Sequence, residues 1–238
     1  MEKLSISVVI PAYNEERRIG KTLRKVIKYL NKKRHDYEII VVDDGSRDDT
    51  AKVVGFFRNK RLMLLQNRKN CGKGFSIKRG MLAARKKYLL FSDADLSTPI
   101  EELEKFVKLK DKYDILIGSR ALKRSEIRIK QPFYRVMMGK VFNLMVNLTV
   151  VRGIKDTQCG FKLFKKDAAK RIFRKQAFRG FGFDVEILFI AKKYGYSIKE
   201  IPIVWTNSPD TKVSAIKDSI RMFADLLRIR VNDLRGKY

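Results

Sequence analysis

The sequence predicts an α/β fold with a Rossmann-like, mostly parallel sheet flanked by helices. Two observations carry this prediction. Short β-rich runs alternate with helical stretches from the N-terminus onward, a rhythm typical of doubly wound sheets. Polar and acidic turns follow several of these runs, where such sheets bind their ligands. With 45% hydrophobic residues and no repeat, low-complexity stretch or linker, residues 1–238 are expected to form a single domain.

The first half of the chain contains the clearest alternation of strands and helices. Strands are expected at residues 5–10, 37–42, 62–66, 88–92 and 115–118. Helices are expected at residues 15–30, 49–58 and 100–110, and from the glycine-containing turn 70–74 to residue 86. Each helix is long enough to cross over the sheet and return the chain to a parallel strand.

The rhythm changes after residue 118. A basic loop is expected at 121–130, a helix that is apolar on several faces at 132–151, and a mixed segment around 160–164. A helix at 183–193 and a strand at 197–204 follow. The chain ends in a basic amphipathic helix, whose apolar face is expected to contain Ile216, Ile220, Phe223, Leu227, Val231 and Leu234.

The charge of the chain points to an anionic partner. The 54 Lys and Arg against 26 Asp and Glu give a formal net charge of +28. Nucleic acid, an acidic membrane surface and phosphorylated substrates all satisfy that expectation, as does a general adaptation to heat or salt. No stretch approaches the ~20 apolar residues of a membrane-spanning helix, and the first ten residues lack the pattern of a signal peptide. We therefore expect a soluble or peripheral protein.

Two polar groups follow the first two strands. Pro11 ends the first strand, Tyr13 can stack on a base, and Glu15 can accept a hydrogen bond from a ribose hydroxyl. The alternative is an ordinary strand-to-helix turn with Asn14 as the helix N-cap. After the second strand, one carboxylate of Asp43-Asp44 could accept a hydrogen bond from a nucleobase and the other could cap the next helix.

The third polar group is Asp93-Ala94-Asp95, at the end of the strand expected over 88–92. Residues i and i+2 of an extended segment point the same way, so the two carboxylates can share one divalent cation with a diphosphate. The alternative is one capping and one solvated Asp. Taken together, three polar groups at successive carboxyl ends of one sheet favour a ligand site.

Several motifs identify a family. VVIPAYNEE, VVDDGSRDDT, KNCGKG and SDADLS resemble the family 2 glycosyltransferases, which have the nucleotide-diphospho-sugar transferase (GT-A type) fold. In the second half, GIKDTQCGFKLF, FDVEIL and Trp205 look like the dolichyl-phosphate glucosyltransferase and mannosyltransferase branch, closer to its glucosyl members. The resemblance implies that residues 1–118 bind the nucleotide-sugar and residues 119–238 receive the acceptor.

The same resemblance implies roles for individual residues. The nucleotide-sugar would be bound by Pro11, Tyr13, Glu15, Asp43, Asp44, Asp93 and Lys212. Asp93 and Asp95 would hold Mg²⁺ or Mn²⁺, and Arg120 and Arg135 would contact the acceptor phosphate. Asp156 and Gln158 would line the sugar pocket, which makes Asp95, Arg120, Asp156 and Gln158 the expected catalytic set.

The activity implied is transfer of a hexose from a nucleotide-sugar to dolichyl or another polyprenyl phosphate, with metal dependence and inversion at the anomeric carbon. Glucose from UDP-glucose is favoured, with mannose from GDP-mannose as the alternative. The acceptor phosphate is already deprotonated near neutral pH, so no strong general base is needed. This agrees with a chain whose one histidine, His35, is expected at the surface.

The expected location is the cytoplasmic face of a membrane, with peripheral attachment to its anionic surface. The helix over 132–151, with Phe133, Met137, Met138 and Phe142, would either dock shallowly on that membrane or pack against the sheet. Two rival classes are less well supported. Sugar-1-phosphate nucleotidyltransferases have a Gly-rich basic loop where PAYNEE stands, and a nucleic-acid-binding protein would need a recognition helix or interleaved aromatics.

Overall fold

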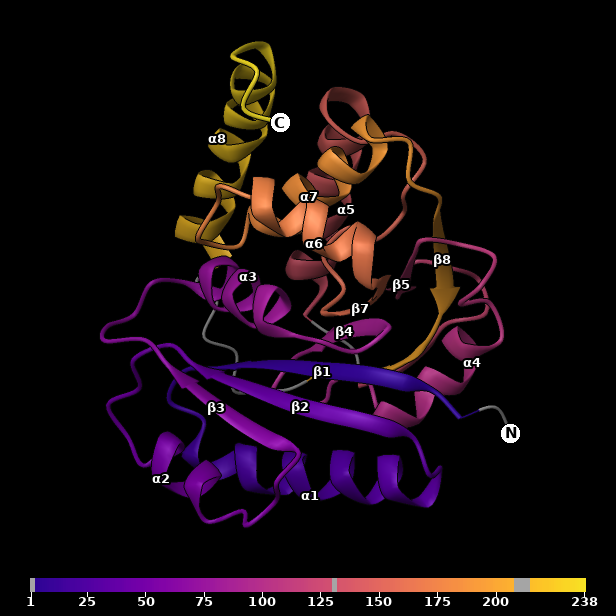
Figure 1. Ribbon diagram of the computed structural model, residues 1–238. Coiled ribbons are helices and arrows are strands. Elements are labelled where there is room, and N and C mark those ends of the chain that lie inside the picture. The colour runs from indigo at the N-terminus through magenta and orange to yellow at the C-terminus, as the bar shows by residue number, and fades with distance from the viewer. Residues whose placement is uncertain (1–2, 130–131, 208–214) are drawn as a thin grey trace.

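A seven-stranded sheet forms the centre of the protein in the computed structural model, which describes residues 3–129, 132–207 and 215–238 (Figure 1). The strand order is β3-β2-β1-β4-β7-β5-β8. These strands are β1 (Ser5–Ala12), β2 (Asp36–Asp43), β3 (Leu62–Gln66), β4 (Tyr88–Ser92), β5 (Ile115–Ser119), β7 (Phe161–Lys165) and β8 (Ile198–Pro202). All neighbours are parallel except β7, which is antiparallel to β4 and β5. The predicted α/β fold with a mostly parallel sheet is confirmed.

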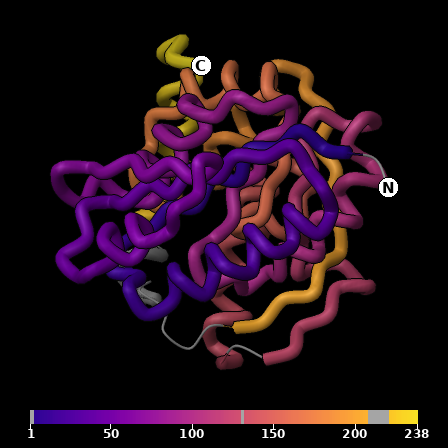
Figure 2. The backbone as a smooth tube through the Cα atoms, turned by 60° about the horizontal axis from the view of Figure 1, so that its bottom comes forward, coloured from indigo at the N-terminus to yellow at the C-terminus, as the bar shows by residue number. Residues whose placement is uncertain are grey.

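Helices cover both faces of this sheet. They are α1 (Glu16–Lys32), α2 (Thr50–Gly55), α3 (Lys73–Ala83), the 3₁₀ turn η1 (Ile100–Glu102), α4 (Leu103–Val107), α5 (Phe133–Thr149), α6 (Lys166–Lys175), α7 (Phe183–Lys193) and α8 (Ala215–Leu234). Figure 1 shows α1 and α2 on one face and α3, α6 and α7 on the other. Figure 2 brings the α1 side forward.

The central strands are buried on both faces, which explains their continuous apolar runs. In β1, Val8 packs into the core on the α1 side, and Val9 packs into the core on the α3 side. In β2, Ile39 packs on the α1 side and Ile40 packs on the α3 side. Strands from residues 1–118 and from residues 119–238 lie in this one sheet.

The structure adds elements that the sequence did not reveal. The expected loop at 121–130 contains β6 (Glu126–Ile129), which pairs with β9 (Val204–Thr206) in a separate two-stranded sheet. Helix α6 was not predicted either. The expected helix at 100–110 is shorter, because it consists of η1 and α4 and ends at Val107.

The predicted apolar face of the terminal helix is wrong by about one position. Met222, Leu226 and Ile229 are the buried side chains, whereas Leu227 and Val231 are exposed. Leu234 is exposed too, Phe223 is half-buried, and the side chains of Ile216 and Ile220 lie outside the described residues. The helix carries two adjacent apolar stripes, so periodicity alone did not indicate which one meets the core.

The prediction that His35 lies at the surface is also wrong. Its side chain is 6% exposed, its Nδ1 accepts a hydrogen bond from the Leu4 amide at 3.3 Å, and its ring packs edge-on against Tyr29. Burial lowers the pKa of His35 below its ordinary value. The polar residues around it in the sequence concealed a partner that lies 31 positions away.

Candidate active site at the carboxyl ends of the strands

A cleft of about 760 Å³ opens where β1, β4 and β5 end. Because these strands share a direction, the side chains that follow them meet at one edge of the sheet. The predicted site residues that line the cleft are Pro11, Tyr13, Glu15, Asp44, Asp93, Asp95, Arg120, Arg135 and Gln158. Asp43 and Asp156 are buried next to it and are not among its lining residues. Lys212 lies outside the described residues.

An ion pair occupies the end of β4. The Nζ atom of Lys73, the first residue of α3, lies 2.6 Å from Oδ1 of Asp93. The Asp93 carboxylate lies directly over Gly160, where a Cβ atom would stand 2.0 Å from Oδ2. Burial alone would lower the pKa of Lys73, but the carboxylates of Asp93, Asp184 and Asp95 outweigh burial and raise it.

The negative charge of the Asp95 carboxylate is not neutralised by an ion pair with any described residue. Its Oδ1 accepts a hydrogen bond from the Ser97 amide, and no salt bridge to Asp95 is found among the described residues. Burial and the neighbouring Asp93 raise the pKa of Asp95 above its ordinary range. A surplus negative charge next to a second carboxylate favours a cation at this position.

The donor set fits a metal ion that is shared with a substrate. Among the described residues, no group of three or more His, Cys, Asp or Glu side chains is arranged to hold a metal ion. Two carboxylates are nevertheless the usual protein contribution to Mg²⁺, which completes its shell with water and substrate phosphates. Asp93 and Asp95 therefore fit a hard divalent ion that binds together with a diphosphate.

Arg120 follows β5 and is held by Asp156. Its Nε and Nη2 donate to the two oxygens of Asp156 at 2.7 and 2.8 Å, and its guanidinium carbon lies 5.4 Å from the Trp205 ring centre. Burial alone would raise the pKa of Asp156, but Arg120 outweighs burial and lowers it. Asp156 thus orients Arg120. The predicted contact of Asp156 with the sugar stays a prediction.

Arg135, on α5, presents a second cationic group to the cleft. Within the described part of the chain, its buried Nε has no hydrogen-bond partner. A buried guanidinium nitrogen without a partner is costly unless a ligand supplies the acceptor. Arg120 and Arg135 both line the cleft, and their predicted contact with an acceptor phosphate stays a prediction.

The strand order separates the two charged regions. Asp93 follows β4 and Arg120 follows β5, and β7 lies between these strands. Two strand spacings correspond to about 10 Å.

The polar turns around the cleft are held by hydrogen bonds. Asp44 accepts from the amides of Cys71 and Gly72 at 2.9 and 2.8 Å, and thereby fixes the turn that carries Lys73. Gly72 has φ +98°, and a Cβ there would lie 2.4 Å from the Arg179 carbonyl oxygen, so this turn requires glycine.

The turns after β1 and β2 support each other. Asp43 accepts from the amide and hydroxyl of Ser46, whose hydroxyl accepts from the Asn14 amide. Asn14 does not cap α1, since its Oδ1 accepts from the Arg47 amide. Glu15 pairs with Arg18 at 2.7 Å. The roles of Asp43 and Glu15 in nucleoside binding stay predictions.

Four residues near the cleft had no assigned role from the sequence. Lys73 and Trp205 line it, as does Asp184, which pairs at 2.5 Å with the fully buried Lys162 of β7. The signal for this pair was a lysine inside an apolar strand, in GFKLF, because a buried lysine needs a carboxylate. The signal for Lys73 was its place in the KNCGKG motif, directly after Gly72, the glycine that the turn requires.

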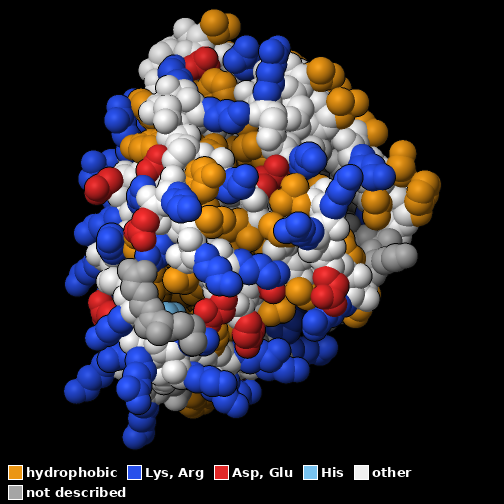
Figure 3. Space-filling model, turned by 90° about the vertical axis from the view of Figure 1, so that its right-hand side faces the viewer, with side chains coloured by type: hydrophobic (Ala, Val, Ile, Leu, Met, Phe, Trp, Pro, Cys, Tyr) orange, Lys and Arg blue, Asp and Glu red, His pale blue; other side chains and the backbone are white. Residues whose placement is uncertain are grey.

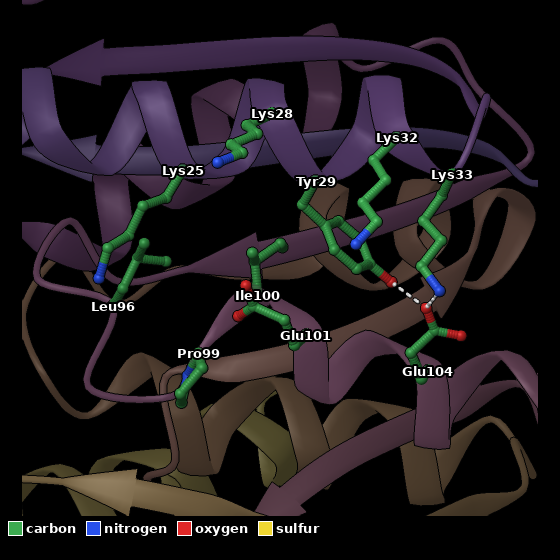
Figure 4. Close-up of a pocket in the computed structure, with 10 residues that line it drawn as sticks. All are labelled: Lys25, Lys28, Tyr29, Lys32, Lys33, Leu96, Pro99, Ile100, Glu101 and Glu104. Atoms are coloured by element: carbon green, nitrogen blue, oxygen red, sulfur yellow. Dashed lines mark hydrogen bonds and ion pairs between the residues drawn. The ribbon is translucent and has the colours of Figure 1, made fainter.

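A second groove, of about 530 Å³, lies between α1 and the segment from Leu96 to Glu104 (Figure 4). Lys25, Lys28, Lys32 and Lys33 line one side. Glu104, on the opposite side, pairs with Lys33 at 2.5 Å and accepts from the Tyr29 hydroxyl at 3.1 Å. The groove shares none of the carboxylates or arginines of the cleft.

The chain matches glycosyl transferase family 2 over residues 7–173. It is 39% identical over 251 residues to the dolichyl-phosphate beta-glucosyltransferase of Dictyostelium discoideum, a match that covers 99% of this chain and 77% of that protein. The proteins of the same name from Homo sapiens and Saccharomyces cerevisiae are 36% and 37% identical, covering 98% and 100% of this chain and 77% of each relative.

Solved structures support the fold. Glucosyl-3-phosphoglycerate synthase from Mycobacterium tuberculosis, in complex with Mn²⁺, UDP and glucosyl-3-phosphoglycerate, matches with a TM-score of 0.70 and 19% identity, covering 95% of this chain and 80% of that one. Mannosyl-3-phosphoglycerate synthase from Rubrobacter xylanophilus matches with a TM-score of 0.71 and 16% identity, covering 98% and 75%.

Proposed function

The chain belongs to glycosyltransferase family 2, and on that premise we propose that it transfers glucose from UDP-glucose to dolichyl phosphate. The proposal rests chiefly on one observation: the Asp95 carboxylate, which has no ion-pair partner among the described residues, lines the same cleft as Arg120 and Arg135. The carboxylate suits a metal ion bound to the donor diphosphate, and the arginines suit the acceptor phosphate. The relatives at 36–39% identity carry this activity in their names, which supports glucose over mannose.

The donor lies on the side formed by residues 1–118. Pro11, Tyr13 and Glu15 border the nucleoside region, and Lys73 supplies a positive charge near the diphosphate. Asp93 and Asp95 would hold Mg²⁺ or Mn²⁺, and the bound ion would supply positive charge to stabilise the diphosphate leaving group. The Mn²⁺ and UDP bound by glucosyl-3-phosphoglycerate synthase support this choice of ligands.

The acceptor lies on the side formed by residues 119–238. Arg120 and Arg135 bind its phosphate, for which a planar guanidinium fork is suited. Asp156 fixes the direction of Arg120. Gln158 also lines the cleft, and its backbone amide donates to Asp156 at 3.3 Å, which supports a contact between its side chain and the sugar hydroxyls.

The reaction is a single displacement. A phosphate monoester has a second pKa of about 6, so an acceptor oxygen carries the attacking lone pair at neutral pH without a general base. This oxygen bonds to the anomeric carbon as the bond to UDP breaks. Attack opposite the leaving group inverts the centre, so an α-linked donor gives a β-linked product.

The enzyme acts at the cytoplasmic face of a membrane that contains its lipid acceptor. Among the described residues, no helix has the length and apolar character needed to cross a bilayer. The net charge of +28 supports attraction to an anionic leaflet, at about 1 kcal/mol for each Lys or Arg near the surface.

A transfer assay tests this function. The purified chain is incubated with Mn²⁺, dolichyl phosphate in detergent, and radiolabelled UDP-glucose, UDP-galactose or GDP-mannose. We expect lipid-extractable label from UDP-glucose, its loss with EDTA, and a β-linkage by NMR. Faster transfer from GDP-mannose would overturn the choice of sugar. A thermal shift with duplex DNA but none with UDP-glucose and Mn²⁺ would overturn the enzyme class.

A further inference from the structure

Glu186, in the first turn of α7, is a buried carboxylate without a cationic partner. Its side chain is 0% exposed, and no ion pair to it is found within the described part of the chain. Lys and Arg side chains are spread over the face of the molecule drawn in Figure 3, so the protein does not lack cations. A buried carboxylate is costly unless it is hydrogen-bonded, and burial raises the pKa of Glu186 above its ordinary value. Its hydrogen-bond partners therefore indicate what this residue does.

Both oxygens of Glu186 hold the loop 176–182, which connects α6 to α7. The amides of Ala177 and Phe178 donate to Oε1 and Oε2, each at 2.9 Å. The hydroxyl of the buried Tyr238 donates to Oε1 at 2.7 Å. These bonds fix the directions of two successive peptide groups at the start of the loop.

The same loop contacts the turn before and after Lys73. A Cβ atom on Gly72 would lie 2.4 Å from the carbonyl oxygen of Arg179. A Cβ atom on Gly74 would lie 2.7 Å from the carbonyl oxygen of Phe178. Since no side chain fits so close to a backbone oxygen, glycines on both sides of Lys73 allow the loop and the turn to touch. A shift of the loop would therefore shift the backbone of Lys73.

Gln176 joins the loop to the turn directly. Its side chain is 2% exposed, and Nε2 donates to the carbonyl oxygens of Gly74 and Phe178 at 2.9 and 2.8 Å. The amide of Phe75 donates in turn to the carbonyl oxygen of Arg179 at 3.2 Å. The loop and the start of α3 are thus tied together by hydrogen bonds in both directions.

The contacts end at the charged region of the cleft. Nζ of Lys73 lies 2.6 Å from Oδ1 of Asp93, and both residues line the cleft. Gly180 and Phe181 of the loop line it too, whereas Glu186 does not. Glu186 can therefore influence a ligand only through the residues that it holds in place.

We propose that Glu186 is a positioning residue for the donor: through the loop 176–182 it holds Lys73 where Nζ can reach the diphosphate of UDP-glucose. This inference rests on the proposed function, which places that diphosphate next to Lys73. Glu186 touches no reacting group and acts through the backbone of the loop and the turn.

Binding of UDP with Mn²⁺ tests this role without any acceptor. Calorimetry measures the UDP affinity of wild type, Glu186→Gln and the control Glu38→Gln. Glutamine keeps the shape of Glu186 but cannot accept from both loop amides. Glu38 also accepts from a backbone amide and a hydroxyl, those of Arg85 and Ser7, but lies near the amino end of β2. We expect Glu186→Gln to bind UDP at least about fivefold more weakly and Glu38→Gln to bind it normally. Equal affinities in all three would overturn the proposal.

A double-mutant cycle tests whether the effect passes through Lys73. Glu186→Gln is also made in the Lys73→Met protein, where the cation that it positions is absent. In that background we expect Glu186→Gln to change the UDP affinity by less than about twofold. The same loss in both backgrounds would show that Glu186 acts on the cleft by another route, and the proposal would fail. A general loss of stability predicts that second result.

Hydrogen exchange separates this inference from the proposed function, because it needs no ligand. We expect the Phe75 amide to exchange about tenfold faster in Glu186→Gln than in wild type, measured by NMR. If wild type neither binds UDP nor transfers glucose, the proposed function fails, whereas faster exchange would still establish the link between loop and turn. Unchanged exchange would overturn that link. If Glu186→Gln does not fold, Gln176→Met, which removes both hydrogen bonds donated by Nε2, decides the same measurements.

Discussion

Arg120 and Asp156 form a two-pronged ion pair, with Nε–Oδ2 and Nη2–Oδ1 distances of 2.7 and 2.8 Å. The Arg120 amide also donates to Oδ2 at 2.9 Å. The Asp156 amide in turn donates to Glu200 at 3.0 Å. The guanidinium is therefore fixed in position and direction before any substrate arrives.

Replacing Asp156 by Asn should weaken acceptor binding. Asn keeps the shape but removes the charge and one acceptor, so we expect KM for the prenyl phosphate to rise about tenfold while KM for UDP-glucose stays unchanged. Unfolding stability should fall by about 1.5–3 kcal/mol, as for a hydrogen bond to a charged group. Steady-state kinetics and urea denaturation measure the two effects. Asp167→Asn, at an exposed position on α6, is the control. Equal increases in both KM values would exclude a specific role in holding Arg120.

Asp95→Asn should remove metal-dependent activity and leave the fold intact. The carboxylate is partly buried near Asp93 and its pKa is raised, so neutralising it relieves repulsion in the metal-free protein. We expect transfer to fall by about 10³-fold or more. The melting temperature without ligand should not decrease, and stabilisation by Mn²⁺ with UDP-glucose should vanish. A variant that keeps a tenth of the activity would remove the metal assignment.

Lys73→Met should increase the affinity for Mn²⁺ in the absence of donor. Without metal, Nζ of Lys73 neutralises Asp93, so removing it leaves the neighbouring carboxylates of Asp93 and Asp95 without an ion pair among the described residues. We expect roughly tenfold tighter Mn²⁺ binding by electron paramagnetic resonance, together with slower transfer because the diphosphate loses a cationic contact. Lys73→Arg keeps the charge and serves as the matched control. Unchanged Mn²⁺ affinity in Lys73→Met would show that this ion pair does not compete with metal.

His35 should make the protein less stable in mild acid. Its pKa is lowered by burial, so between the folded and the unfolded value the unfolded chain binds more protons. Stability therefore rises with pH in this window and is lost as the pH falls below about 6.5. His35→Asn, which can still accept from the Leu4 amide, should reduce this loss. Melting temperatures of both proteins between about pH 7.5 and 5 test the effect. Parallel curves would contradict it.

Strand positions were predictable because the central strands are buried on both faces and read as apolar runs. Tyr13, Asp93 and Arg120 follow such runs, so their meeting at one edge could be foreseen from parallel strands alone, although β1 extends through Pro11 to Ala12. The antiparallel direction of β7 could not be predicted, because an apolar run does not indicate whether a strand is parallel or antiparallel to its neighbours. The partner of Lys162 was equally hidden, since Asp184 lies 22 residues further along the chain. Periodicity also could not choose between Leu226 and Leu227 as the buried residue of α8.

The place of β7 in the sheet has a consequence for synthesis on the ribosome. Strands β4 and β5 are consecutive in the chain, but β5 pairs only with β7 and β8 among the described strands, and both of these begin at or after Phe161. A nascent chain that ends at Ser119 can form only the β3-β2-β1-β4 half of the sheet, which leaves β4 as an open edge. Such edges recruit other strands. The edge of β4 therefore stays uncovered in the growing chain until the residues from Phe161 to Lys165 have emerged.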